Sequence, residues 1–335
     1  MPLRWGLLGT ARINRHLIPA IRSSPRSILH CVASREASRV AAYAAEWDIP
    51  HGWASYEALL DSDVDIVYIS LPNSLHVPWT LRALQAGKHV LCEKPLALTA
   101  AAVDDLAAAA RASGRIVTEG LMYRHAAQTL RIAEMVAAGD IGEVRTIAGG
   151  YSHPQSRGDS DPRVNPLLGG GALWDVGCYP VSFAHLVSGA LPVAVSGART
   201  LGPGGVDHAF AATIRYANGV TAQCFAGFRM AYQTFMRIVG DTGVVDIPHP
   251  FRPAPFDSFT VLRDQVCERI DIRGSAVFED EVADMEDAVL GIKPPRVSLV
   301  ESRQLAHTLE VLHHSADRDG SLLSLSRPPG LAESP

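Results

Sequence analysis

Two short segments of the chain carry side chains that can handle a proton. Glu93-Lys94-Pro95 follows an apolar run, and Asp175 and Tyr179 stand four residues apart behind three glycines. A lysine can hold its charge beside a developing alkoxide or lower the pKa of a neighbouring acid. Asp175 and Tyr179 would share one face of a helix, which Pro180 requires to begin or kink nearby. The alternatives that the residue types leave open are a solvated loop lysine and a purely structural Asp–Tyr pair.

The elements that must position these residues begin with an alternation of two periods in the first 120 residues. Short apolar runs, expected to be strands, lie at Leu3–Leu8, Leu29–Ser34, Asp65–Ser70, His89–Cys92 and Ile116–Thr118. Amphipathic or Ala-rich stretches, expected to be helices, lie at Ala11–Ser23, Glu36–Trp47, His76–Ala86 and Ala100–Ala112. Strand–helix alternation predicts parallel strands with crossovers, and hence an α/β, doubly wound sheet.

The turn after the first predicted strand suits a phosphate-binding loop. It reads Gly9, Thr10, Ala11, Arg12, Ile13, Asn14. The segment stands where a GxGxxG turn would be but matches it only at Gly9. Small residues can still let backbone N–H groups at a helix N-terminus face a pyrophosphate. An ordinary strand–helix turn is the alternative.

The end of the second predicted strand points to the form of the dinucleotide. An acidic residue there would hold the free ribose 2′-hydroxyl of NAD. This chain has Ser34 and Arg35 instead, with Arg39 one helical turn later. A hydroxyl and a guanidinium suit a 2′-phosphate, so the pattern predicts NADP(H). A surface arginine is the alternative.

Two further strand ends carry polar groups. Leu71, Pro72, Asn73 and His76 follow the third predicted strand, and Glu93-Lys94 follows the fourth. Ligands of open parallel sheets bind beyond the carboxyl ends of the strands, so we expect these residues to face one crevice. His76 has an alternative as a helix-start histidine with structural bonds only.

After residue 120 the pattern changes to longer strand-like segments. Strands are expected at Glu143–His153, Val193–Thr200, His208–Tyr216, Val220–Phe228 and Thr234–Val239, and helices at Ala126–Ala138, Glu279–Leu290 and Leu299–Ala316. Asn218-Gly219 between two strands is a strong hairpin signal. We therefore predict an α+β domain on an open, mostly antiparallel sheet. The acidic residues Glu281, Asp284, Glu286 and Asp287 are expected to form a solvated helix face.

Length and composition narrow the class of protein. A chain of 335 residues exceeds the usual limit for one core. The predicted division is a dinucleotide-binding domain at 1–120, a substrate-binding and oligomerisation domain at 121–325, and a disordered tail at 326–335. A net charge of −5 without a long basic run argues against nucleic acid and anionic membranes as partners. Five scattered cysteines and no signal-like or membrane-spanning segment predict a cytoplasmic protein, and no metal site is expected.

Taken together, these motifs resemble the Gfo/Idh/MocA family of sugar oxidoreductases. The matching pieces are GTARI at 9–13, SR at 34–35, LPNSLH at 71–76, Glu93-Lys94-Pro95, EGLMYRH at 119–125 and GGGALWDVGCYP at 169–180. The Glu-Lys-Pro tripeptide and the Asp-x-Gly-x-x-Tyr block are the specific parts. The resemblance is strongest to NADP-dependent D-xylose 1-dehydrogenases and dimeric dihydrodiol dehydrogenases, and extends to sugar 3-ketoreductases.

The resemblance implies a Rossmann-type domain and roles for particular residues. Lys94 matches the family's catalytic lysine, Asp175 its substrate-side aspartate, and Tyr179 stands where other members carry histidine. Either Tyr179 is the acid/base with a pKa lowered by Lys94, or Lys94 relays the proton and Tyr179 orients the substrate hydroxyl. Residues implied to line the sugar pocket are Arg124, Arg163, Asn165 and Trp174.

The function this implies is hydride transfer between NADP(H) and the carbinol or carbonyl carbon of a sugar, polyol or trans-dihydrodiol-like substrate. A 3-ketoreductase acting on a nucleotide-linked keto sugar is one alternative, for which His153, Arg157 and Arg163 leave room at the substrate mouth. A non-enzymatic NADP-binding sensor or repressor is another. An apolar outer face of the second domain's sheet would make the protein a homodimer or homotetramer.

Overall fold

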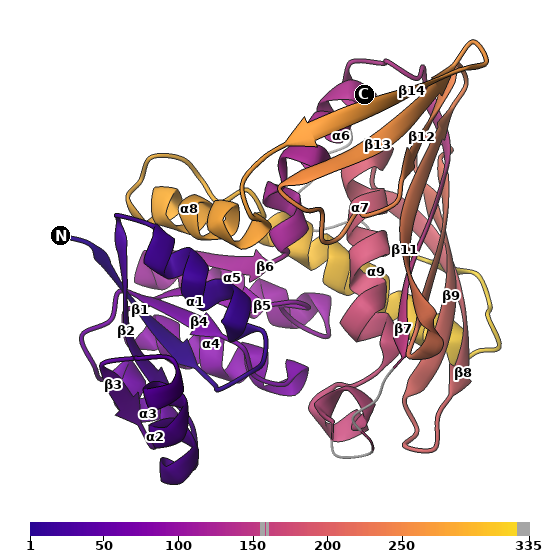
Figure 1. Ribbon diagram of the computed structural model, residues 1–335. Coiled ribbons are helices and arrows are strands. Elements are labelled where there is room, and N and C mark those ends of the chain that lie inside the picture. The colour runs from indigo at the N-terminus through magenta and orange to yellow at the C-terminus, as the bar shows by residue number, and fades with distance from the viewer. Residues whose placement is uncertain (155–157, 159–160, 327–335) are drawn as a thin grey trace. The chain divides into compact units, whose positions relative to one another are not determined.

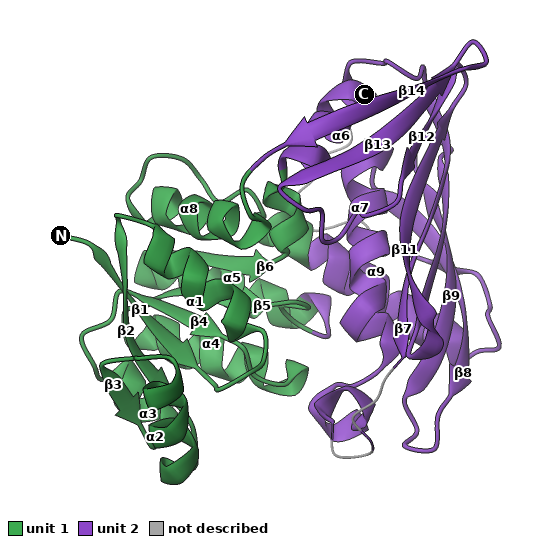
Figure 2. Ribbon diagram, in the orientation of Figure 1, with its two compact units in different colours: residues 1–97, 101–126, 275–302 green, residues 98–100, 127–274, 303–335 purple. Residues whose placement is uncertain are grey.

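The computed structural model describes residues 1–154, 158 and 161–326 (Figure 1). Arg157 and residues 327–335 of the predicted tail lie outside the described residues. The chain divides into two compact units (Figure 2). Unit 1 comprises residues 1–97, 101–126 and 275–302, and unit 2 comprises residues 98–100, 127–274 and 303–335.

Unit 1 is built on a parallel sheet in the order β3-β2-β1-β4-β5-β6. Its strands are β1 Leu3–Leu8, β2 Ser27–Ala33, β3 His51–Trp53, β4 Ile66–Ile69, β5 His89–Glu93 and β6 Val117–Gly120. Its helices are α1 Asn14–Ser23, α2 Ala37–Glu46, α3 Tyr56–Leu60, α4 His76–Gln85, α5 Ala100–Ser113 and α8 Val277–Val289. All four side chains of β4 are fully buried, as expected for a parallel strand with both faces covered. The predicted doubly wound fold is confirmed.

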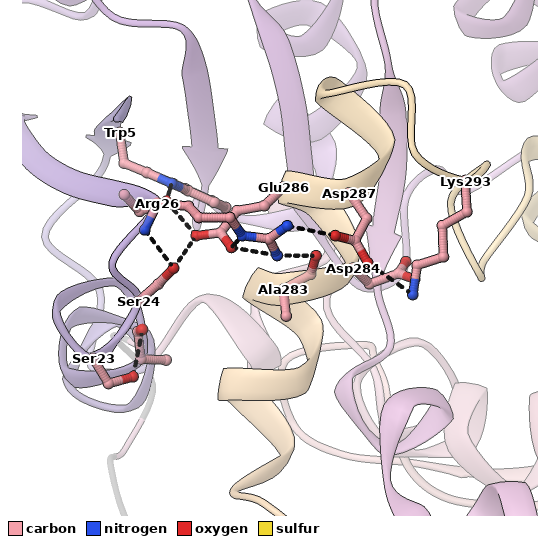
Figure 3. Close-up of polar contacts among 11 residues, drawn as sticks. Trp5, Ser23, Ser24, Arg26, Ala283, Asp284, Glu286, Asp287 and Lys293 are labelled. Atoms are coloured by element: carbon pink, nitrogen blue, oxygen red, sulfur yellow. Dashed lines mark hydrogen bonds and ion pairs between the residues drawn. The ribbon is translucent and has the colours of Figure 1, made fainter. Parts of the chain in front are cut away.

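Helix α8 belongs to unit 1, although the sequence analysis placed residues 275–302 with the second domain. Its acidic residues bind the start of β2 (Figure 3). Glu286 Oε1 accepts from the hydroxyls of Ser24 and Ser27 at 2.5 Å, and Glu286 Oε2 accepts from Arg26 Nε at 2.8 Å. Trp5 Nε1 in turn donates to Ser27 Oγ at 2.7 Å.

The prediction of a solvated acidic face on this helix is therefore wrong. Glu281, Asp284 and Glu286 are 2 %, 3 % and 0 % exposed. Glu286 is buried because its partners come from residues 24–27, at the entry to β2 and far away in the sequence. Asp284 is buried with its carboxylate accepting from Arg296 N at 2.9 Å.

Unit 2 is built on a larger sheet in the order β14-β13-β12-β11-β7-β10-β9-β8-β15. Its strands are β7 Val144–Pro154, β8 Pro192–Leu201, β9 Asp207–Tyr216, β10 Thr221–Gly227, β11 Arg229–Gly240, β12 Gly243–Ile247, β13 Phe256–Arg263, β14 Val266–Arg273 and β15 Leu323–Ser324. Neighbouring strands are antiparallel except β10 and β7, which are parallel. The mostly antiparallel sheet is thus confirmed, and the hairpin at Asn218-Gly219 joins β9 to β10 with Gly219 at φ 87°.

Helices cover one face of this sheet in unit 2. They are α6 Ala127–Ala137, α7 Cys178–Ser188 and most of α9 Leu299–Ala316. The inner side chains of β10 alternate with outer ones, because Ala222, Cys224 and Ala226 are buried. An added Cβ on Gly177, just before α7, would lie 3.3 Å from Ala226 Cβ, which identifies the inner face. No helix within the described residues has the length and apolar character needed to span a bilayer.

Candidate active site

The turn after β1 depends on Gly9. Its φ of +113° is one that L side chains rarely adopt, and an added Cβ would lie 3.1 Å from Leu71 Cδ2. Gly9 N donates to Ala33 O at 3.0 Å, and the buried Asn14 amide donates to Gly9 O at 2.9 Å. The turn is therefore fixed between the ends of β1, β2 and β4.

The segment that follows presents donors without acceptors. Among the described residues, nothing accepts a hydrogen bond from the backbone N–H groups of Thr10, Ala11, Arg12 and Ile13. Ile13, the residue before α1, offers no side-chain cap. Unpaired N–H groups at a helix N-terminus suit an anion such as a phosphate.

The end of β2 offers a hydroxyl and two guanidinium groups. Ser34 is buried and its N–H donates to Trp53 O at 3.0 Å, while Arg35 and Arg39 are exposed. Arg39 Nε lies 3.4 Å from Glu36 Oε2, with both side chains more than half exposed. Burial raises the pKa of Tyr56, and the nearby Arg35 guanidinium opposes that rise.

At the end of β4 the chain passes through Leu71 and Pro72 into a short 3-10 helix, Asn73–Leu75, and then α4. His76 is 1 % exposed, and its two ring nitrogens lie 2.8 Å from the carbonyl oxygens of Pro95 and Leu71. Burial lowers the pKa of this imidazole. The His76 ring thus lies between two loops, and its role as a cofactor contact stays a prediction.

The tripeptide Glu93-Lys94-Pro95 lies at the end of β5, as predicted. Tyr68 Oη donates to Glu93 Oε1 at 2.5 Å, and Lys94 N lies 3.3 Å from Glu93 Oε2. Burial, reinforced by the Glu93 carboxylate, raises the pKa of Tyr68 well above its usual value. Lys94 is partly exposed and the Lys94–Pro95 peptide is cis. Glu93 is thus tied to the sheet, next to a lysine that solvent reaches.

In unit 2 the glycine-rich segment wraps around a carboxylate that the sequence analysis missed. Asp207, the first residue of β9, is 2 % exposed and accepts from Leu173 N at 2.7 Å. Gly171 has a φ of +131°, and an added Cβ there would lie 2.3 Å from Asp207 Oδ1. Burial raises the pKa of Asp207 to about 6. A lone aspartate at a strand start carries no pattern that marks this role.

Asp175 and Tyr179 lie at the junction of a π-helical turn, Leu173–Gly177, with α7. Asp175 Oδ2 lies 3.0 Å from Arg163 Nε and 3.8 Å from His153 Nε2. The Asp175 carboxylate is the main reason that the pKa of Arg163 is raised. The buried Tyr179 ring lies 5.5 Å from the ring of Tyr151, measured between centroids. The predicted helix start near Pro180 is present, with a π-helical turn before it.

The residues implied for a sugar pocket are distributed unevenly. Arg163 reaches Asp175, as described above. Asn165 accepts from Leu167 N at 3.0 Å and so caps the 3-10 helix Pro166–Leu168. Trp174 is 7 % exposed, with its ring 6.0 Å from that of His313.

Arg124 belongs to unit 1, and its role in a sugar pocket stays a prediction. It is 7 % exposed and its Nη2 lies 2.7 Å from Glu301 Oε1.

Within unit 2, Asn165 also lines a cavity of about 390 Å³ together with His208 and Arg229. A cavity of this size is in the range of small-molecule sites.

The chain matches family models in both halves and is similar to characterised oxidoreductases. Residues 3–121 match a family model described as an oxidoreductase family with an NAD-binding Rossmann fold, and residues 129–246 match the GFO/IDH/MocA C-terminal domain. The chain is 35 % identical to a D-xylose 1-dehydrogenase (NADP(+)) of Haloferax volcanii, over 94 % of this chain and 98 % of that one. It is 33 % identical to a trans-1,2-dihydrobenzene-1,2-diol dehydrogenase of Xenopus laevis, over 74 % of this chain and 76 % of that one. Among solved structures, a 3-ketoreductase from Actinomadura kijaniata in complex with NADP and TDP-benzene matches with a TM-score of 0.88 and 31 % identity. The match covers 94 % of this chain and 98 % of that one.

Proposed function

Since the chain belongs to the Gfo/Idh/MocA family of oxidoreductases, we propose that it transfers a hydride between NADP(H) and the carbinol or carbonyl carbon of a sugar, polyol or trans-dihydrodiol-like substrate. The observation that carries the proposal is the end of the parallel sheet in unit 1. There a glycine turn with unpaired N–H groups lies beside a strand, β2, that is followed by Ser34-Arg35 and not by an acid.

The residues present fit the dinucleotide. The φ of Gly9 is one that a side chain would strain, and the N–H groups of Thr10 to Ile13 suit a pyrophosphate. Ser34, Arg35 and Arg39 would hold a 2′-phosphate, and Leu71, Pro72, Asn73 and Glu93 would complete the site at the ends of β4 and β5. When bound, the cofactor supplies the hydride donor or acceptor. A 2′-phosphate would compete with Glu36 for Arg39.

The chain's own residues manage the proton of the reacting hydroxyl. Lys94 and Tyr179 are assigned this task, with Asp175 fixing the orientation of the substrate. The ion pair of Asp175 with Arg163 supports the orienting role, because it holds the carboxylate in one place. Two schemes remain: Tyr179 as the acid/base, or Lys94 as the relay with Tyr179 as an orienting donor.

A second candidate is a 3-ketoreductase acting on a nucleotide-linked keto sugar. The cavity lined by Asn165, His208 and Arg229 favours it, because this space in unit 2 could take a group larger than a sugar ring. Burial, and then the nearby Arg229, lower the pKa of the His208 imidazole, which disfavours its charged form. Arg229 would therefore be the cation that such a substrate meets there.

A substrate panel followed by NADPH absorbance tests the proposal. Purified protein is assayed with aldoses, polyols, dihydrodiols and a dTDP-linked keto sugar, each with NADP(H) and with NAD(H). Turnover of free sugars, polyols or diols with NADP(H) supports the first candidate, and turnover of only the nucleotide-linked sugar supports the second. Tight NADPH binding without turnover of any substrate would favour a sensor and contradict both.

The outer face of the sheet in unit 2 supports association of two or more copies. Phe225 on β10 and Phe235 on β11 face away from the helices, with ring centroids 5.9 Å apart. An apolar sheet face is typical of a subunit interface. Light scattering should give a dimer or tetramer, and Phe225→Arg should shift it toward monomer.

The free thiols, four of them buried, favour a cytoplasmic location, which fractionation of cells would test.

A further inference from the structure

The chain beyond Lys94 is held by a buried acid, Glu119. Leu96 N donates to Glu119 Oε1 at 2.9 Å, and both residues are 1 % exposed. Glu119 is part of β6, so its carboxyl is attached to the sheet and not to a loop. The hydrogen bond therefore links the segment two residues after Lys94 to a rigid element.

The ends of β5 and β6 are in close contact at this point. Cys92 pairs with Glu119 and Glu93 pairs with Gly120 in the parallel register. An added Cβ on Gly120 would lie 3.2 Å from Cys92 O and 3.4 Å from Glu93 Cα. A glycine here allows β6 to lie against the backbone that leads into Lys94.

A second side chain lies at the other end of the same peptide group. His76 Nδ1 lies 2.8 Å from Pro95 O, so Pro95 O and Leu96 N are bonded to side chains from α4 and β6. Both polar atoms of the Pro95–Leu96 peptide group, the second peptide group after Lys94, are thus held by buried partners. A catalytic side chain needs this kind of support, because its own bonds rotate freely.

We propose that Glu119 is a positioning residue for Lys94. Its carboxyl oxygen accepts the Leu96 N–H and so fixes the course of the backbone from which Lys94 extends. The inference rests on the proposed catalytic role of Lys94 and adds the residue that orients it. Burial raises the pKa of Glu119; a protonated carboxyl still offers an acceptor oxygen, and so does an amide.

The test compares three variants of the full-length protein. Glu119→Met keeps the length of the side chain but removes the acceptor, whereas Glu119→Gln keeps an acceptor oxygen. Thr118→Val is the matched control: Thr118 is buried in the same strand, but its hydroxyl donates to Val297 O at 2.9 Å, away from Lys94. We expect Glu119→Met to lower kcat by about tenfold to a hundredfold, since small misplacements of reacting groups cost this much. Glu119→Gln and Thr118→Val should stay within about threefold, and NADPH affinity, measured by fluorescence titration, should be unchanged in all three.

Hydrogen exchange gives a readout that does not depend on activity. The amide of Leu96 should exchange faster in Glu119→Met and stay protected in Glu119→Gln and Thr118→Val. If Glu119→Met is as active as Thr118→Val, or if Glu119→Gln is as slow as Glu119→Met, the positioning role is overturned.

Lys94→Ala separates this inference from the proposal on which it rests. If Lys94→Ala loses kcat and Glu119→Met does not, only the positioning role fails. If Lys94→Ala keeps kcat, the catalytic role of Lys94 fails first. Where Lys94→Ala is slow, adding Glu119→Met should cause no further loss, because the acid acts through the lysine.

Discussion

The link between α8 and the start of β2 can be tested by removing one carboxylate (Figure 3). Glu286→Ala takes the acceptor from the hydroxyls of Ser24 and Ser27 and from Arg26 Nε. Breaking a buried ion pair costs about 3–5 kcal/mol. Arg26 is 36 % exposed and keeps Asp287 Oδ1 at 2.6 Å, so it is not left as an isolated buried charge. We therefore expect a loss at the lower end, about 3 kcal/mol.

The measurement is thermal unfolding of Glu286→Ala and of a control variant, Glu57→Ala. The control breaks an ion pair that has the same N–O distance but is exposed to solvent. Arg26 Nη2 lies 2.8 Å from Glu286 Oε2, and Arg82 Nη1 lies 2.8 Å from Glu57 Oε1. The side chains of Arg82 and Glu57 are both more than half exposed. Glu57→Ala should cost at most about 1 kcal/mol. A loss of about 3 kcal/mol in Glu286→Ala corresponds to a fall in Tm of about 6–12 °C for a domain of this size. Equal falls in Tm for the two variants would refute the argument that burial and not distance decides the strength.

Three further outcomes follow from the site. Arg35→Ala should weaken NADP binding by about 1.5–3 kcal/mol and spare NAD, the range for a hydrogen bond to a charged group; calorimetric titration with equal losses for both cofactors would contradict the assignment. Tyr179→Phe should reduce kcat by about a hundredfold or more if the tyrosine is the acid/base, and should mainly raise KM if Lys94 is the relay; a kcat within about threefold and an unchanged pH profile would exclude the first scheme. Asp207 keeps its proton up to about pH 6 in the folded chain, against 3.8 for an ordinary aspartate, so stability should fall by up to about 3 kcal/mol as pH rises through this window. Asp207→Asn should abolish that fall in melts at about pH 4.5 and about pH 7.5, and parallel curves for the two proteins would argue against it.

Local patterns alone predicted the bounds of several helices and strands. The predicted bounds Leu3–Leu8 and Leu299–Ala316 coincide with β1 and α9. Both follow from the spacing of apolar side chains over a few turns or residues, which needs no distant partner. The sequence also predicted the tight turn from Gly9 and the NADP(H) preference from Ser34, which stands where an acid would hold NAD. A tight turn and a 2′-phosphate each restrict residue type directly.

Turn chemistry explains why part of the second sheet was missed. The hairpin between β13 and β14 turns at Asp264-Gln265, both with positive φ, 49° and 63°. Such a turn is usually recognised by Asn-Gly or Asp-Gly, and this pair lacks the glycine. The hairpin before β10 was found because Asn218-Gly219 supplies that signal.

Tertiary structure decided what the acidic and titratable residues do. Glu286 is a buried partner of Ser24, 262 positions away in the sequence, although its own helix predicts a solvated face. Asp207 accepts from Leu173 N in a glycine-rich segment 34 residues earlier, and the His76 ring is buried between two backbone carbonyl oxygens. Burial and hydrogen bonding depend on which segments meet in the folded chain, and a local pattern records only the side chain that each segment brings.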